Sequence, residues 1–100
     1  MTTEEMKAIF DRDDEGRQFL KFENVKKPLS KRPDLCAFLM LDAALPGGDD
    51  DIVAGAEHDI FYLQVDVEKL AEVATEELIT DLSRCGVFFD EEFDCLAMYT

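Results

Sequence analysis

The chain has 100 residues, 47% of them apolar, and its 24 acidic and 10 basic side chains give a formal net charge of −14. This length corresponds to one domain, and the apolar fraction argues against intrinsic disorder. The charge disfavours direct binding to nucleic acid or anionic membranes, because both depend on Lys and Arg that neutralise phosphates. The negative charge can then serve to bind a basic protein or a cation, or only to keep the protein soluble.

The three cysteines, Cys36, Cys85 and Cys95, form an odd set without a CxxC motif. Such a set is typical of a reducing compartment, where cysteine serves as a small apolar core residue. We therefore expect a cytoplasmic protein without disulfides or zinc. No apolar run is long enough to cross a bilayer, and the acidic N-terminus is unlike a signal peptide, so no membrane association is expected.

Acidic and basic residues are unevenly distributed along the chain. Residues 1–33 contain 8 basic and 7 acidic side chains, whereas residues 34–100 contain 2 basic and 17 acidic ones. Four of the basic residues lie in the segment KKPLSKR, residues 26–32. Two interpretations stay open: this segment neutralises the acidic body of its own molecule, or it contacts the acidic face of another copy in a homo-oligomer.

The first half of the chain predicts two helices and one short strand. Thr2 or Thr3 can cap a helix from about residue 4 to residue 10, and the acidic stretch 11–16 then reads as a loop. Residues 17–22 favour a strand. Pro33 suits the first turn of a helix that continues to Leu45, and this helix is apolar nearly all round, which predicts burial.

The second half predicts a loop, a strand, two helices and a hairpin. Residues 49–57 read as a loop or a frayed turn, and residues 59–65 as a strand. Helices follow at 67–73 and 76–85, capped by Asp66 and Thr75, and Gly86 suits a left-handed cap. Two short strands, residues 87–89 and 95–99, then flank a five-residue loop, a spacing typical of a hairpin, with Val87, Phe89, Leu96 and Met98 pointing inward.

This order of elements predicts a single α+β domain over residues 1–100. The sheet has three to four strands and ends in the C-terminal β-hairpin, and the helices pack on one of its faces. Strict strand–helix–strand units are too few for a doubly wound sheet.

Residues 11–16, DRDDEG, begin like an EF-hand calcium loop, with Asp11, Asp13 and Glu15 at its first ligand positions. The pattern ends there, because Gln18 and Phe22 occupy positions where the motif has an apolar residue and a bidentate glutamate. A divalent-cation site and a solvated acidic turn are the alternatives.

Catalysis and cofactor binding find no support in the sequence. The single histidine, His58, has no nucleophile or orienting group at a recognisable spacing, and the glycines form no phosphate-binding motif. We therefore expect a protein that is not an enzyme and binds no cofactor.

The segment DEEFD, with one aromatic ring among four carboxylates, is the strongest candidate for contact with a partner. The alternative is that Phe93 folds back onto the hairpin and the acids only solvate the turn. If the preceding helices share a face with this loop, their carboxylates extend the surface and imitate the charge of a nucleic-acid backbone. The candidate residues are Asp90, Glu91, Glu92, Phe93, Asp94, Glu76 and Glu77.

The sequence therefore predicts an acidic interaction protein whose partner is basic and itself nucleic-acid-binding. In size and charge it is similar to small acidic inhibitors carried by phages and mobile elements. A divalent-cation-binding protein and a structural assembly subunit are the alternatives.

Overall fold

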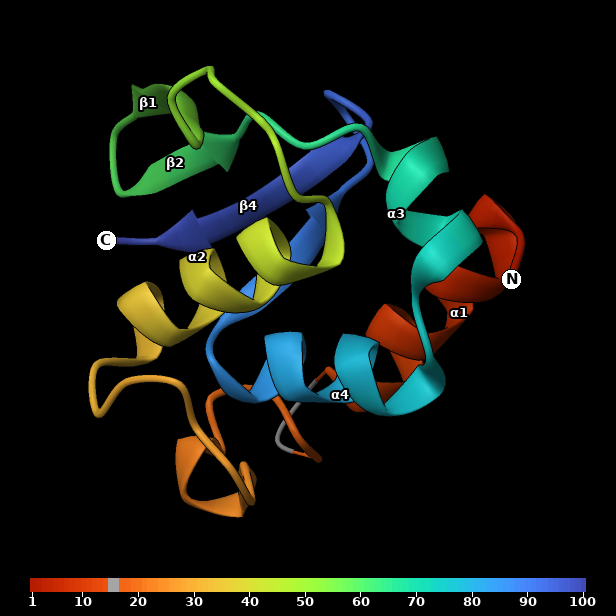
Figure 1. The fold of residues 1–100 in the computed structure, drawn as a ribbon, viewed down its shortest axis with the longest axis vertical. Coiled ribbons are helices and arrows are strands. Elements are labelled where there is room, and N and C mark those ends of the chain that lie inside the picture. The colour runs from red at the N-terminus through yellow and green to blue at the C-terminus, as the bar shows by residue number, and fades with distance from the viewer. Residues whose placement is uncertain (15–16) are drawn as a thin grey trace.

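A computed structural model describes residues 1–14 and 17–100, and this part of the chain contains four α-helices and one four-stranded antiparallel sheet (Figure 1). The predicted α+β class and C-terminal hairpin are confirmed. None of the helices in residues 1–14 and 17–100 has the length and apolar composition of a membrane-spanning segment. In chain order the elements are α1 (Thr3–Asp13), a 3-10 turn (Phe22–Asn24), α2 (Pro33–Ala44), β1 (Val53–Glu57), β2 (Ile60–Leu63), α3 (Val67–Val73), α4 (Glu76–Arg84), β3 (Val87–Asp90) and β4 (Cys95–Tyr99).

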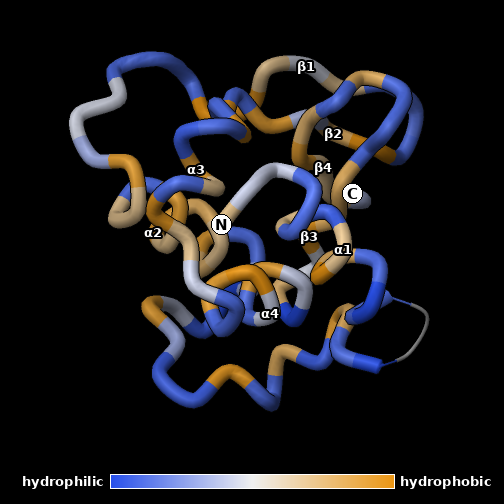
Figure 2. Tube along the Cα trace, turned by 90° about the vertical axis from the view of Figure 1, so that its right-hand side faces the viewer, coloured by the Kyte–Doolittle hydropathy of each residue, from blue (hydrophilic) through white to orange (hydrophobic). Residues whose placement is uncertain are grey.

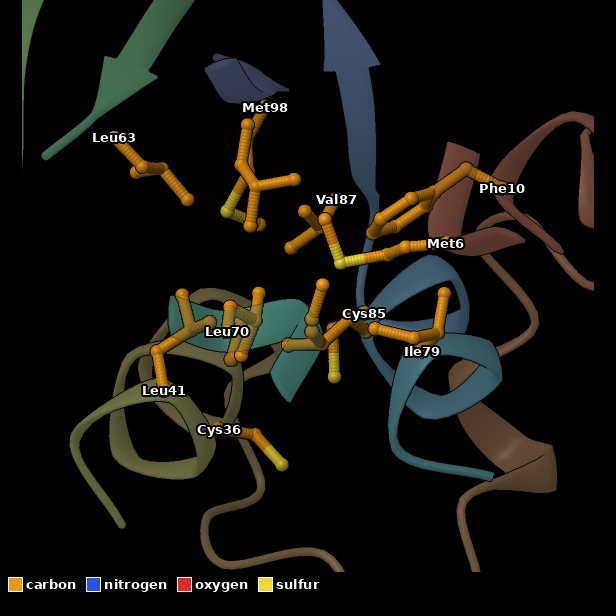
Figure 3. Close-up of a cluster of buried hydrophobic side chains, with 14 of the residues drawn as sticks. Met6, Phe10, Cys36, Leu41, Leu63, Leu70, Ile79, Cys85, Val87 and Met98 are labelled. Carbon is orange, nitrogen blue, oxygen red and sulfur yellow. The ribbon is translucent and has the colours of Figure 1, made fainter. Parts of the chain in front are cut away.

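The strand order is β1-β2-β4-β3, so the C-terminal strand lies inside the sheet. In the hairpin Val87 pairs with Met98 and Phe89 with Leu96. These four side chains belong to the core or pack against it, as the alternation along the two strands predicts. The helices cover this inner face, and side chains from all of them meet it (Figure 3).

The helix termini are capped as the sequence predicts. Thr2 and Glu5 form a capping box at the start of α1, in which each side chain accepts a backbone N–H from the other residue. Asp66 and Thr75 cap α3 and α4. Gly86 has φ +101°, a backbone conformation that other residues rarely adopt, so glycine suits this C-terminal cap.

The predicted loop at residue 11 and the predicted strand at 17–22 are both wrong. Helix α1 continues to Asp13, whose carbonyl accepts the N–H groups of Gln18 and Phe19. Leu20 then adopts φ +64° and donates its N–H to Ser83. These bonds hold residues 17–20 in a turn against α4, and they compete with an extended conformation.

Two further expectations need correction. Residues 53–57 form the edge strand β1 rather than a loop, although all five are exposed. Helix α2 is buried on one side only, at Cys36, Ala37 and Leu41, whereas its apolar opposite side lies at the surface. The predicted burial of this helix on all sides is wrong, because no other helix in the described part of the chain covers that side.

Candidate functional site

The outer face of the sheet, which points away from the helices, carries two groups of aromatic side chains. Because Val87 and Met98 point into the core, the alternation of β3 and β4 directs Phe88 and Tyr99 to the outer face. Their rings stack with centroids 4.7 Å apart, and the ring of Phe19 meets Phe88 edge-on at 6.3 Å. This first group lies along β3 and the end of β4.

The second group consists of Tyr62 on β2 and Phe93 in the hairpin loop. Their rings meet edge-to-face, with centroids 5.0 Å apart. Ala97 pairs with Tyr62 on one side and with Phe88 on the other, and it is fully buried beside these larger neighbours. The two groups therefore share one surface across three strands. We call it the outer aromatic face, defined as Phe19, Tyr62, Phe88, Phe93 and Tyr99.

Phe93 packs against its own molecule and is also exposed, so each of the two interpretations of this residue holds in part. It packs against Tyr62, yet 54% of its surface remains exposed. A shallow groove of about 380 Å³ opens beside it, lined in part by Ala54, Gly55 and Val65. The ring is therefore held in place and still available for contact.

Asp90 shapes the hairpin loop from the end of β3. Its carboxylate accepts the backbone N–H groups of Glu92 at 2.9 Å and Phe93 at 3.2 Å. Such bonds fix tight turns. Asp94 adopts φ +54° at the other end of the loop, and its carboxylate lies 3.3 Å from the Lys7 ammonium of α1. The loop thus has a defined shape, while Glu91 and Glu92 remain exposed.

Carboxylates from two different turns act on the Tyr62 phenol. Loss of solvation raises the pKa of the Tyr62 phenol, and the negative charges of Glu57, Asp90 and Glu92 raise it further. Glu57 comes from the end of β1, whereas Asp90 and Glu92 come from the hairpin. The outer aromatic face therefore has an acidic rim, which the sequence reasoning identified only at the hairpin.

Glu76 and Glu77 do not extend this rim. They begin α4, where Glu76 pairs with Arg12 of α1, whereas the hairpin loop pairs with α1 through Lys7. The two basic residues are five positions apart, roughly 140° around the helix, so the partners approach α1 from different sides. In Figure 1 the hairpin loop lies at the top of the molecule and α4 begins at the lower right. The condition under which the helix carboxylates would extend the hairpin surface is therefore not met by Glu76.

Two of the three candidate metal ligands lie in a helix rather than in the predicted loop. Asp11 and Asp13 belong to the last turn of α1, and Glu15 is outside the described residues. Asp13 is 2% exposed; it accepts the Thr80 hydroxyl at 2.7 Å and Arg12 Nε at 3.1 Å. No group of three or more His, Cys, Asp or Glu side chains in residues 1–14 and 17–100 is arranged to hold a metal ion. The described contacts give Asp13 a structural role.

We expect the three thiols to react with iodoacetamide in the order of their burial. Burial raises the pKa of the Cys85 thiol, and the neighbouring Cys36 raises it further. Burial also raises the pKa of the Cys95 thiol, but Cys95 is only half-buried on the sheet. At pH 8 mass spectrometry should find Cys95 modified first and Cys85 only after unfolding. Rapid modification of Cys85 in the folded protein would contradict its burial.

The same pKa direction predicts how stability depends on pH. In the unfolded chain Cys85 loses its proton above its ordinary pKa of 9.0, whereas in the folded chain it keeps the proton. Its contribution to stability is therefore present below that pH and is lost as the pH rises above it.

Comparison with models of protein families, with curated proteins and with solved structures found no match to this chain.

Proposed function

We propose that this protein is a non-enzymatic interaction module that binds a basic partner protein through its outer aromatic face and the acidic rim. The observation that supports this most directly is Phe93, which stands half-exposed on Tyr62 among carboxylates from two turns. A ring that is already held in place loses little conformational freedom when it binds.

This combination of groups suits arginine and lysine side chains. A guanidinium group can stack on an aromatic ring while it donates hydrogen bonds to a neighbouring carboxylate. The net charge of −14 would also accelerate the encounter with a positively charged protein. The aromatic rings then supply the contact, and the surrounding carboxylates supply attraction and selectivity.

A basic site that otherwise holds nucleic acid is the partner surface that this charge fits best. Such a site presents several cations at phosphate spacing, and the acidic rim would occupy it as a nucleic-acid mimic and inhibit it. The free thiols of Cys36 and Cys85, buried in the core, support a reducing compartment such as the cytoplasm.

A pull-down from bacterial lysate tests this proposal with two matched variants. The first carries Glu91→Lys, Glu92→Lys and Phe93→Ala in the hairpin loop. The control carries Glu68→Lys, Glu72→Lys and Val73→Ala on α3, which makes the same charge change and removes an apolar side chain that is also 54% exposed. We expect wild type and control to retain the same few basic proteins at moderate salt, and the hairpin variant to bind them at least about tenfold more weakly.

Addition of single- or double-stranded DNA then tests the mimic. Competing nucleic acid should release the captured protein if both occupy the same basic site. Equal loss of binding in the two variants would contradict the proposal, because it would mean that only the overall charge matters.

A further inference from the structure

Helix α2 carries an exposed apolar ridge opposite its buried side. Leu35, Leu39 and Ala43 follow one another at four-residue spacing, and Leu35 and Leu39 are 42% and 39% exposed. In the described structure only Cys36, Ala37 and Leu41 of this helix are buried. A helix that is apolar on all sides is normally covered on all sides. The ridge is therefore a surface suited to contact with another protein.

A groove runs beside this ridge. It has a volume of about 380 Å³ and is lined by Leu29, Met40, Ala43, Val73 and Leu78, among others. Leu29 and Val73 are more than half exposed. Ridge and groove lie side by side, because Ala43 belongs to both. The groove of one copy can therefore receive the ridge of another copy.

The two ends of α2 carry opposite charges. At its N-terminal end the exposed segment 26–32 contains Lys26, Lys27, Lys31 and Arg32, and at its C-terminal end lie Asp42 and the acidic loop 49–51. Within residues 1–14 and 17–100 neither set forms an ion pair, which favours the second of the two interpretations that the sequence leaves open, contact with another copy. Figure 1 shows the basic segment leading into one end of α2 and the acidic loop leaving the other.

We infer that two copies of this chain form a symmetric dimer in which their α2 helices pack antiparallel. This arrangement places the basic end of each helix against the acidic end of its partner, and it brings each ridge beside the other groove. A twofold interface of this kind uses the same surface on both copies and closes at two subunits. Parallel helices would instead place like charges together.

The dimer is independent of the proposed partner binding. Helix α2 lies to one side of the sheet (Figure 2), where Phe38 contacts Phe61 of β2 on the inner face. The outer aromatic face therefore stays open in both copies. Two such faces on one particle would strengthen binding to a partner with repeated basic sites.

Salt alone cannot test this dimer. Added salt screens the attraction between the helix ends, but it also screens the repulsion between two chains of net charge −14. Reversal of specific charges separates these effects, because it changes the attraction at a known place.

Sedimentation equilibrium over a range of concentrations tests the inference. We expect the wild type to have twice the monomer mass of 11.4 kDa. Leu39→Glu should raise the dissociation constant at least about 100-fold, because it places two glutamates in the apolar centre. Tyr99→Glu is the matched control, since Tyr99 is 55% exposed on the outer aromatic face, on the other side of the sheet from α2, and this variant should remain dimeric. Circular dichroism checks that each variant folds.

Charge exchange provides the second arm of the test. Lys31→Asp with Arg32→Asp should weaken the dimer, and so should Asp49→Lys with Asp50→Lys. The four substitutions together should restore it. A wild type with the mass of one chain, or an unaffected Leu39→Glu variant, would overturn the inference. The hairpin variant should still dimerise and Leu39→Glu should still bind a basic partner, so this proposal and the proposed function can fail separately.

Discussion

Replacement of Leu96 by alanine is expected to lower the free energy of unfolding by about 3 to 4 kcal/mol, the largest effect of any single truncation proposed for this chain. Leu96 is fully buried on β4, the strand that pairs with both β2 and β3. Its truncation removes apolar contact and leaves a cavity between the sheet and the helices. A domain of this size is typically stable by only about 5 to 15 kcal/mol, so this is a large fraction.

Urea denaturation followed by circular dichroism measures this loss. Leu20→Ala is the matched control, because Leu20 is 63% exposed and loses little buried surface. We expect its effect to stay below about 1 kcal/mol. A similar loss in both variants would mean that Leu96 does not lie in a closely packed core.

Asp13→Ala is expected to lower the free energy of unfolding by about 2 to 3 kcal/mol, because the substitution removes a buried carboxylate that accepts hydrogen bonds from Thr80 and Arg12. The carboxylate accepts the Thr80 hydroxyl and Arg12 Nε and so joins the end of α1 to α4. Asp13→Asn keeps an oxygen that can accept the hydroxyl, so its loss should be smaller, about 1 kcal/mol. Urea denaturation compares the two variants.

Calcium distinguishes this structural role from metal binding. If Asp13 serves the fold alone, millimolar calcium leaves the unfolding midpoint of the wild type unchanged. A clear rise in the midpoint with calcium, abolished by Asp13→Asn, would favour the cation-binding alternative.

The parts of the fold that the sequence predicts correctly are those set by local chemistry. The caps at Thr2, Asp66 and Thr75 need only a side chain and the N–H groups of the next turn. The glycine at position 86 likewise predicts the left-handed conformation that is found there. The hairpin follows from two alternating segments at a short spacing.

The errors arise where distant contacts decide the structure. Residues 53–57 contain small side chains without alternation, and they form a strand because β2 supplies their hydrogen-bonding partners. Residues 17–20 are held by the carbonyl groups of Asp13 and Ser83 rather than by a neighbouring strand. No local pattern reveals either contact.

In the candidate site too, local features can be predicted from the sequence and contacts between distant segments cannot. The hairpin acids and Phe93 were visible in the sequence. The alternation that places Leu96 and Met98 inward also implies that Tyr99 faces outward, so half of the aromatic face could have been predicted. The sequence does not predict that Tyr62 joins this face, because the position of Tyr62 depends on the pairing of β2 with β4.

A titration of the ¹⁵N-labelled protein with a hexa-arginine peptide, followed by NMR, shows directly whether the outer aromatic face binds basic groups. We expect chemical-shift changes to concentrate at residues 57–62 and 88–99, and to weaken strongly in the hairpin variant. Equal changes at the exposed acids of α3 and of the loop 49–51, unaltered by that variant, would contradict the proposed function, because the peptide would then respond to charge alone.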